Sequence, residues 1–430
     1  MKNFDPRECI FYHIYPIGFC GAPYRNTGEP ASNRISKIEK WIPHLKSIGI
    51  NTLYLGPVFE SGCHGYDTHD YTLIDSTHGT NDDFLKLCKE LKEAGISLVL
   101  DGVFNHVGRG FFAVQDVLRN RENSPYCSWI SGLRFDRNNS YKDDLFYDSW
   151  AGHEMLVKLN LQNPDVREHL LSAVDMWIDT FDIAGLRLDA ADCIDHDFFR
   201  ELRKRTKEKN PSFWLMGEIT DSNDYREWAN PDMLDSITNY ECYTLFYTGI
   251  NSKHMPTIAK GLERQFGKNG IYKDTVLYTF LDNHDVNRIA SVLKSKNNLK
   301  NLYTLIYTIP GTPAIYYGSE WGIEGKKERR NDSPLRPAID TDNPQITDRG
   351  LMEHLRNLAN LRQSSHALMY GSYEQVHLTD ETFAFARKSD KETKLVFMNI
   401  SKKEETICAD FCGRHYEVTL PAHSAEIKDF

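Results

Sequence analysis

Residues 185–192 read Gly-Leu-Arg-Leu-Asp-Ala-Ala-Asp, and this stretch decides how the rest of the chain is interpreted. The mostly apolar run from Ile183 to Leu188 predicts a short buried strand that ends in charge. In an extended strand Arg187 and Asp189 point to the same face, because they are two residues apart. A cation beside a carboxylate keeps the carboxylate ionised, as a nucleophile requires at neutral pH. A structural ion pair at a strand end explains this octapeptide equally well.

Three further stretches each follow an apolar, strand-like run and contain acids or histidine. They are Asp101–Gly108 (Asp-Gly-Val-Phe-Asn-His-Val-Gly), Met216–Ile219 (Met-Gly-Glu-Ile) and Phe280–Arg288 (Phe-Leu-Asp-Asn-His-Asp-Val-Asn-Arg). The carboxyl ends of parallel strands meet at one edge of a sheet, where α/β proteins bind their ligands. Four charged strand ends in one α/β chain therefore indicate a single shared site.

Composition places the chain among globular proteins that do not bind nucleic acid. Its 430 residues are 40% hydrophobic and 26% charged, which suits one large domain and a smaller one. The net charge of −10 argues against nucleic acid as a partner, because such binding depends on basic contacts with phosphates. No apolar run approaches the length that crosses a bilayer, so we expect no membrane association.

The N-terminal residues and the cysteines indicate a cytoplasmic protein. The first eight residues are polar, and His13 and Pro16 interrupt the apolar stretch that follows, so no secretory leader is expected. Nine cysteines, an odd number, are scattered along the chain, which favours reduced thiols over a disulfide framework. The sequence leaves open whether the protein is a monomer or a homo-oligomer.

Strand-like and helix-like segments alternate along the chain, which predicts an α/β fold with a parallel sheet covered by helices. The strands are expected at residues 10–15, 52–55, 97–103, 183–188, 213–216, 236–238, 276–281 and 314–317. The clearest helical patterns cover residues 35–48, 82–94, 165–180, 196–208 and 347–362, and a polar loop is expected at 61–75. Eight such units predict a (β/α)₈ TIM barrel.

Two segments depart from this alternation. Residues 105–156 are rich in Asn, Asp, Ser, Gly and aromatic residues and show no long helical period, so we expect a small inserted domain after the third strand. Short alternating runs at 382–387, 394–399, 404–408 and 416–420 predict a C-terminal antiparallel β-sandwich. The predicted division is therefore a barrel from 1–104 and 157–366, an insertion at 105–156, and a β-sandwich at 367–430.

In a (β/α)₈ barrel the residues that follow the strands converge on one rim. The candidates are Tyr66, Asp67, Asp101, Asn105, His106, Arg187, Asp189, Glu218, His284 and Asp285. Three carboxylates with an arginine and two histidines suit cleavage of glycosidic bonds, in which one acid protonates the leaving oxygen and another attacks or activates water. The residues alone do not say which acid has which role, and Tyr66 or His106 taken singly fits an ordinary structural role.

The four stretches resemble, in order and spacing, the four short conserved blocks of the α-amylase family of glycoside hydrolases, of clan-H type. The matching residues are Asp-x-Val-x-Asn-His, Gly-x-Arg-x-Asp, Gly-Glu and Asn-His-Asp. The resemblance covers essentially the whole chain, with the insertion similar to the family's domain B and the tail to its domain C. His64–Tyr71, Val157–Asn160, Leu188–Asp192 and Asn239–Tyr240 resemble most the neopullulanase, cyclomaltodextrinase and maltogenic amylase branch.

The resemblance implies a role for each candidate. Asp189 would be the nucleophile, Glu218 the acid/base, and Asp285 the residue that binds the sugar in the −1 subsite and stabilises the transition state. The remaining implied roles are substrate binding for Tyr66, Asp67, His106, Arg187, His284 and Arg336, and support for Asp101 and Asn105. In particular, Asp67 with Arg336 would contact the far edge of the −1 sugar.

The implied activity is retaining hydrolysis of α-1,4-glucosidic bonds in maltodextrins, cyclodextrins or pullulan-like glucans. A 4-α-glucanotransferase would use the same residues, and a catalytically inactive sugar-binding protein is the alternative from another class. No cofactor is expected. Asn105 resembles a calcium ligand of other family members, but the insertion shows no cluster of acidic ligands, so we expect no metal. Thr220 and Gly318-Ser319-Glu320 depart from the branch pattern.

Overall fold

The computed structural model describes residues 4–28, 32–329 and 331–430, so the first three residues of the polar N-terminal stretch lie outside it. Eight parallel strands form one sheet in the order β10-β9-β8-β5-β2-β1-β12-β11. They are β1 (Phe11–Ile14), β2 (Thr52–Leu55), β5 (Ser97–Gly102), β8 (Gly185–Leu188), β9 (Trp214–Gly217), β10 (Ser236–Ile237), β11 (Tyr278–Phe280) and β12 (Thr312–Tyr316). A parallel bridge from Thr238 to Tyr278 joins the two edges, so the predicted barrel and all eight of its strands are confirmed.

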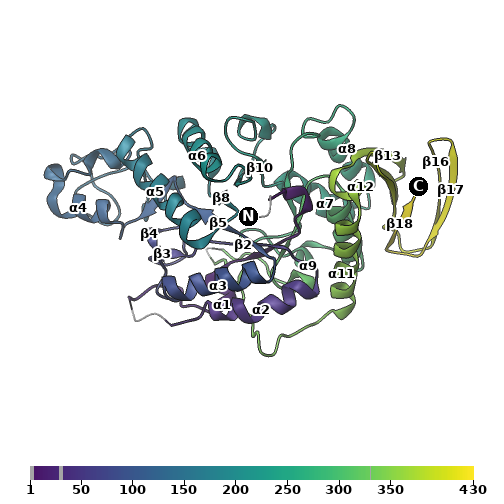
Figure 1. Cartoon of the computed structure of the whole chain (residues 1–430), viewed down its shortest axis with the longest axis horizontal. Helices are drawn as coiled ribbons and strands as arrows, with labels where there is room; N and C mark the ends of the chain where they lie inside the picture. The colour runs from purple at the N-terminus through teal and green to yellow at the C-terminus, as the bar shows by residue number, and fades with distance from the viewer. Residues whose placement is uncertain (1–3, 29–31, 330) are drawn as a thin grey trace.

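Helices cover the barrel on its outside (Figure 1). They include α2 (Ser36–Ser47), α3 (Asn81–Glu93), α5 (Pro164–Phe181), α6 (His196–Lys209), α7 (Tyr240–Ser252), α8 (Met255–Phe266), α10 (Leu299–Thr308) and α11 (Arg349–Ser364). Side-chain caps determine where several helices begin. Thr80 forms a capping box before α3, and Asn163 caps α5. The five predicted helices are confirmed. Within the described residues, no helix has both the length and the apolar character needed to cross a membrane.

The side chains inside the barrel form layers, with a charged layer directly above an apolar one, and the strand register determines which residues share a layer. Phe11, Tyr54, Val99, Trp214 and Tyr278 are buried and pack together inside the barrel. Side chains alternate along each strand, so the next inward position on β5 and on β8 is charged. The parallel register pairs Asp101 of β5 directly with Arg187 of β8. The charged layer therefore lies directly above a buried apolar core.

The segment between the third and fourth barrel strands has its own small structure. The antiparallel pair β6 (His106–Gly108) and β7 (Leu156–Lys158) closes its base. Between them lie α4 (Phe112–Asn120) and three short 3₁₀ turns, η2 (Arg121–Asn123), η3 (Cys127–Trp129) and η4 (Trp150–Gly152). The helix α4 was not predicted. Its apolar face consists of only three buried residues, which is too short a pattern to show a helical period. The boundaries at 105 and 156 stay a prediction.

The expected polar loop at 61–75 is wrong over most of its length. β3 (Phe59–Ser61) and β4 (Thr68–Ile74) form an antiparallel hairpin with two register irregularities. The polar side chains of β4 hide the strand pattern in the sequence, because only Thr68, Tyr71 and Ile74 of its residues are buried. The hairpin leaves only the turn at 62–67 as a loop, and this turn carries Tyr66 and Asp67 to the rim.

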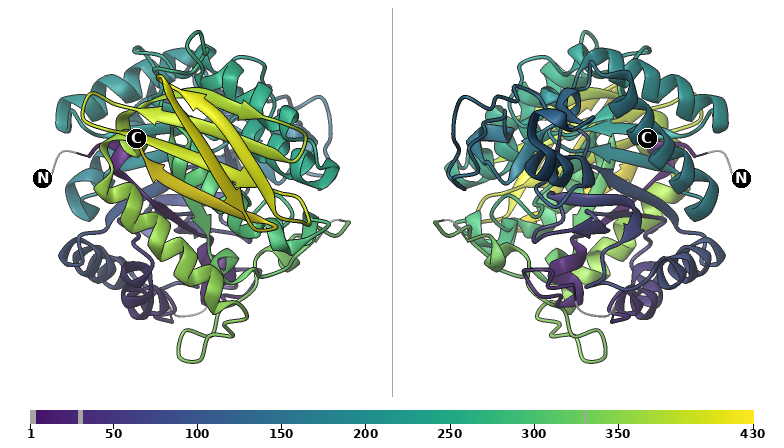
Figure 2. Two further views of the ribbon diagram at one scale, coloured as in Figure 1. Left: turned by 90° about the vertical axis from the view of Figure 1, so that its right-hand side faces the viewer. Right: turned by 90° about the vertical axis from the view of Figure 1, so that its left-hand side faces the viewer.

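The C-terminal unit is the predicted antiparallel β-sandwich, at the opposite end of the long axis from α4 (Figures 1 and 2). One sheet has the order β13-β14-β15-β18 and the other pairs β16 with β17. The strands are β13 (Ser372–Leu378), β14 (Thr382–Lys388), β15 (Thr393–Asn399), β16 (Glu405–Phe411), β17 (Arg414–Leu420) and β18 (Ser424–Asp429). Ala384, Leu395, Phe397, Ile407 and Val418 form its core. β13 and β18 were not predicted, because most of their side chains are polar.

Arg387 connects the β-sandwich to the barrel. It lies on β14, is 1% exposed, and donates to the backbone carbonyls of Gly371 and of Thr308, at the end of α10. A buried guanidinium with carbonyl partners satisfies several polar groups at once. Removing it leaves those carbonyls unpaired in a region without water.

We expect Arg387→Met to lower the free energy of unfolding by about 2–4 kcal/mol, the cost of leaving buried acceptors unsatisfied. Lys388→Met is the matched control, because Lys388 is the next residue of the same strand and is exposed. Urea denaturation followed by tryptophan fluorescence measures both. A loss for Arg387→Met no larger than that of the control would contradict the role assigned to this contact.

Candidate active site

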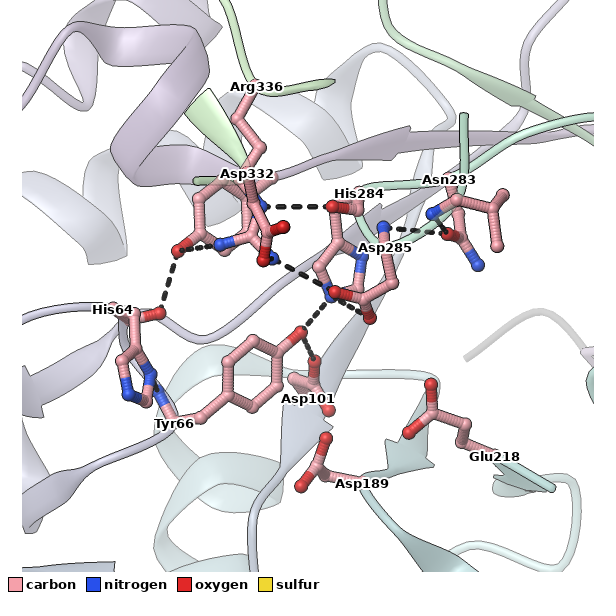
Figure 3. A network of polar contacts seen from close by, with 12 residues as sticks. His64, Tyr66, Asp101, Asp189, Glu218, Asn283, His284, Asp285, Asp332 and Arg336 are labelled. Carbon is pink, nitrogen blue, oxygen red and sulfur yellow. Dashed lines mark hydrogen bonds and ion pairs between the residues drawn. The ribbon is translucent and has the colours of Figure 1, made fainter. Parts of the chain in front are cut away.

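Three carboxylates, those of Asp101, Asp189 and Glu218, lie near one another at the rim (Figure 3), and Arg187 contacts all three. Its Nη1 lies 2.9 Å from Asp101 Oδ1 and 2.9 Å from Asp189 Oδ1, and its Nη2 lies 2.6 Å from Glu218 Oε1. The arginine is 3% exposed, so water screens these contacts little. One buried guanidinium thus fixes the ends of β5, β8 and β9 relative to one another.

Backbone bonds between neighbouring strand ends fix where Asp189 and Glu218 sit. The amide of Asp189 donates to Gly102 O at 3.0 Å, and the amide of Glu218 donates to Leu188 O at 2.9 Å. Burial raises the pKa of Asp189 well above its ordinary value; Arg187 opposes this shift, and Glu218 adds to it. The contact with Arg187 therefore opposes the effect of burial on the pKa of Asp189 without cancelling it.

Glu218 has two further partners. The phenol of Tyr240 donates to Glu218 Oε1 at 3.2 Å, and the amide of Ala190 donates to Oε2 at 3.2 Å. Asn283 Nδ2 in turn donates to the Tyr240 oxygen at 2.9 Å. This chain links β11 to the carboxyl group that follows β9.

Asp285 is held as an anion on the other side of the site. Arg336 Nη2 lies 2.9 Å from its Oδ1, and His284 Nε2 lies 2.9 Å from its Oδ2. Enclosure acts to raise the pKa of Asp285, but His284 and Arg336 together hold it well below its ordinary value. The amide of Asp285 donates to Asn283 Oδ1 at 2.8 Å, which fixes the turn after β11. A permanent negative charge here can bind hydroxyls and face a developing cation.

Aromatic rings line the floor of the site. The Tyr66 hydroxyl lies 2.5 Å from His284 Nε2 and 3.2 Å from Asp101 Oδ2. The ring of Tyr15 is stacked on His284, with centroids 5.4 Å apart. Tyr15 also lies under the guanidinium of Arg336, 4.5 Å from the ring centroid. Such rings offer flat apolar faces to a sugar.

His106 points an unpaired ring nitrogen toward Asp189. Asn105 Nδ2 donates a hydrogen bond to His106 Nδ1 at 3.1 Å. Because Nδ1 accepts this bond, the ring proton is on Nε2. Nε2 is buried without a hydrogen-bond partner, 3.9 Å from Asp189 Oδ2. Burial lowers the pKa of His106 to about 3, so the ring is neutral. A neutral donor aimed into the site suits a sugar hydroxyl.

Asp67 lies at the rim but is bonded within its own turn. Its Oδ1 accepts from the amides of Cys63 at 3.1 Å and His64 at 3.2 Å. Among the contacts of the described residues, none joins Asp67 to Arg336, which instead binds Asp285, His284 O, Tyr15 and Asp332. Asp67 and Arg336 are therefore separate groups in the described part of the chain, and their implied contact with the −1 sugar stays a prediction.

The comparisons with known proteins agree with this geometry. The model of the family described as alpha amylase, catalytic domain, matches residues 14–350. The chain belongs to the α-amylase family. A cyclomaltodextrinase from Bacillus sp is 31% identical over 93% of this chain and 74% of its own, and neopullulanase 2 from Thermoactinomyces vulgaris is 31% identical over 93% and 71%.

A solved structure has the same architecture over both whole chains. It is the cyclic α-maltosyl-(1→6)-maltose hydrolase from Arthrobacter globiformis, with a TM-score of 0.85, 26% identity, and coverage of 98% of this chain and 99% of that one. The predicted family is thus confirmed, and with it the prediction that the chain is a glycoside hydrolase.

The α-amylase fold raises the question of calcium at Asn105. The Oδ1 of Asn105 is buried and unpaired, so one oxygen ligand is available. Calcium takes about six to eight oxygens. Within the described part of the chain, the group of His, Cys, Asp or Glu side chains that could hold an ion is Cys63, His64 and Asp67, not a set around Asn105. The residues present do not fit a calcium site there.

Four side chains at this candidate site were not predicted from the sequence as site residues. Tyr15, Tyr240 and Asn283 reach it as described, and the Trp150 ring lies 5.9 Å from His106 and is stacked on His153. Asn283 stands within the block around His284 and could have been found there. The other three depend on how distant segments pack.

We expect Tyr240→Phe to lower kcat/KM about tenfold to a hundredfold. The lost hydroxyl donates to Glu218 Oε1, so its removal leaves this carboxyl group less well positioned. A hydrogen bond to a charged group is worth about 1.5–3 kcal/mol, which corresponds to this range. Tyr243→Phe, on the same helix and stacked on Phe280, is the matched control. A kcat/KM unchanged in folded Tyr240→Phe would remove this role.

Proposed function

We propose that the protein hydrolyses α-1,4-glucosidic bonds in maltodextrins and cyclodextrins with retention of configuration. The observation that carries the proposal is the arginine shared between Asp189 and Glu218, with the anionic Asp285 held separately by His284 and Arg336. A guanidinium that touches both acids keeps their oxygens close together. This supports the separation of about 5–5.5 Å used by retaining enzymes, which leaves no room for a water between sugar and nucleophile.

In the first step Asp189 attacks the anomeric carbon and Glu218 gives its proton to the leaving oxygen. Asp189 keeps its contact with Arg187 throughout, so its charge is stabilised while the bond forms. The C–O bond to the leaving sugar breaks as the C–O bond to Asp189 forms.

In the second step Glu218, now ionised, removes a proton from water. The water attacks the anomeric carbon from the side that the first sugar left, and Asp189 departs as a carboxylate. Asp285 faces the positive charge that develops at the ring in both steps. His106 and His284 bind hydroxyls of the −1 sugar, Tyr66 contacts its face, and Asp101 supports Arg187. Asp67 and Arg336 bind the sugar from separate positions.

The relatives support the substrate class. Their names state action on cyclomaltodextrin, on pullulan and on a cyclic maltosyl-maltose. The partner is therefore proposed to be an α-glucan oligosaccharide. The complete set of three acids argues against an inactive sugar-binding protein, and transfer to a second sugar remains an outcome of the test below.

We propose a cytoplasmic location and a reaction that needs no metal. All nine cysteines are unpaired in the structure: Cys9, Cys20, Cys63, Cys88, Cys127, Cys193, Cys242, Cys408 and Cys412. Reduced thiols are typical of the cytoplasm. Counting thiols in denatured, unreduced protein from fresh cells tests this, and a count well below nine points to an oxidising compartment.

The activity is tested with maltose, maltotriose, a cyclodextrin, pullulan, starch and sucrose, with products resolved by size. We expect cleavage of the cyclodextrin and of maltotriose, without accumulation of products longer than the substrate, before and after dialysis against EDTA. Longer oligosaccharides from maltotriose would indicate a 4-α-glucanotransferase instead. Folded protein inert on the whole panel would reject the proposal, and loss of activity in EDTA restored by calcium would reject the metal-free part.

The roles of the acids are tested with α-glucosyl fluoride and azide. We expect Asp189→Ala to lower turnover of natural substrate by about 10⁴-fold or more. In Glu218→Gln the fluoride leaves without an acid, the glycosyl-enzyme builds up, and azide attacks it without a base to give the α-azide. In Asp189→Ala azide enters from the vacated face and gives the β-azide. Asp285→Asn should respond to neither rescue.

Product anomers are read by nuclear magnetic resonance. The β-azide from Glu218→Gln together with the α-azide from Asp189→Ala would reverse the two assignments. Natural product released with inverted configuration would exclude double displacement.

A further inference from the structure

We propose that Cys63, His64 and Asp67 form a site for a borderline-soft divalent cation such as Zn²⁺, and that its occupation competes with the glucan. The competition rests on the proposed function, because it assumes that the sugar uses Asp67. The cation site itself rests only on the three side chains. It is separate from the calcium question at Asn105.

The three side chains are spaced as a metal needs. One ligand atom from each lies within 4.8 Å of the others, with Cys63 Sγ 3.4 Å from Asp67 Oδ2 and His64 Nδ1 3.8 Å from Asp67 Oδ1. Tetrahedral Zn²⁺ with bonds of about 2.0–2.3 Å separates its ligands by roughly 3.3–3.6 Å. Small side-chain rotations therefore suffice to bind the ion.

The turn prearranges these ligands. The amides of Cys63 and His64 both donate to Asp67 Oδ1, which orients the carboxylate and leaves Oδ2 facing the thiol. The amide of Tyr66 donates to His64 Nδ1 at 3.2 Å, and an ion bound at this nitrogen would replace that hydrogen bond. Gly62 has no Cβ to block the carboxylate, since a Cβ there would lie 2.5 Å from Oδ2. Such supporting bonds are what orients metal ligands in proteins.

The ligand chemistry selects the ion. A thiolate, an imidazole and one carboxylate suit Zn²⁺ and its neighbours, whereas Ca²⁺ and Mg²⁺ prefer oxygen ligands alone. Cys63 and His64 are half-buried and Asp67 is buried, so the open side of the trio is available to water as a fourth ligand. Three protein ligands and one water are the usual set for a zinc site that keeps an exchangeable position.

The position of the trio connects it to the sugar site. The Tyr15 hydroxyl donates to His64 O at 2.8 Å, and Tyr15 is the ring that lies under Arg336 and is stacked on His284. Figure 3 shows His64 and Tyr66 on one side of the site, across from Asp285. A cation bound to Asp67 would occupy the carboxylate that the sugar is proposed to use. Bound metal and bound glucan therefore exclude each other.

The site is tested with Co²⁺, whose thiolate complexes absorb in the near ultraviolet. Chelator-treated protein should show this band at one equivalent of Co²⁺. Cys63→Ser should weaken binding at least about tenfold, because one of three ligands is lost. Cys193→Ser is the matched control, since Cys193 is exposed beside Asp192 but has no imidazole in the same cluster. If the melting temperature of Cys63→Ser shows that this variant does not fold normally, His64→Gln serves as a second variant.

Competition is measured in the same titration. Maltotriose at ten times its own Kd, measured by calorimetry, should raise the apparent Kd for Co²⁺ about elevenfold if binding is exclusive. Zn²⁺ should raise KM for maltotriose and leave kcat unchanged. A thiolate band that survives both Cys63→Ser and His64→Gln would overturn the site. A Cys63-dependent band insensitive to bound maltotriose would overturn the competition. Protein that binds Co²⁺ through Cys63 but cleaves no glucan would reject the proposed function alone.

Discussion

The site depends on one buried cation among three acids. Arg187 contacts Asp101, Asp189 and Glu218, so the cluster carries more negative than positive charge in a region with little water. Such a group is costly unless it is fully bonded or partly protonated. Asp101 is the most completely bonded, because Tyr54 and Tyr66 also donate to it. Asp189 and Glu218 share the same cation, and they are the two acids proposed as nucleophile and as acid/base.

The barrel limits the free-energy cost of this arrangement because it places the charged side chains in one layer and the apolar side chains in another. Below the charged layer, Phe11, Val99, Trp214 and Tyr278 pack without charged groups. The strand period of two brings one inward residue per strand to each layer, so a single register decides which residues meet. A shift of one residue in the pairing register of β8 would turn Arg187 outward, and its contacts with the three acids would be lost. Fold and chemistry are therefore specified by the same pairing.

The parts of the structure that could be predicted from sequence are those with local signals. All eight barrel strands, five helices and the charged strand ends are readable, because apolar runs and the residues that follow them are contiguous. The strands β4, β13 and β18 were not predicted, because their side chains are largely polar. Tyr15 and Tyr240 escaped for another reason: their role exists only once β1, α7 and the rim are assembled. Asp67 was predicted as a rim residue, but its bonds to the amides of Cys63 and His64 could not be predicted from spacing in the sequence.

The departure at Gly318-Ser319-Glu320 shows how the rim tolerates change. Ser319 Oγ donates to Asp282 at 2.8 Å, and Glu320 accepts from Tyr12 at 2.7 Å and lies 2.8 Å from His44 Nε2. Arg288, fully buried, then donates to the carbonyls of Tyr317 and Leu335, the residue before Arg336. Arg336 is therefore positioned by a chain of buried bonds that starts at the strand ends, although it lies in a loop. The position of this part of the rim therefore depends on the network of buried bonds and not on a single residue.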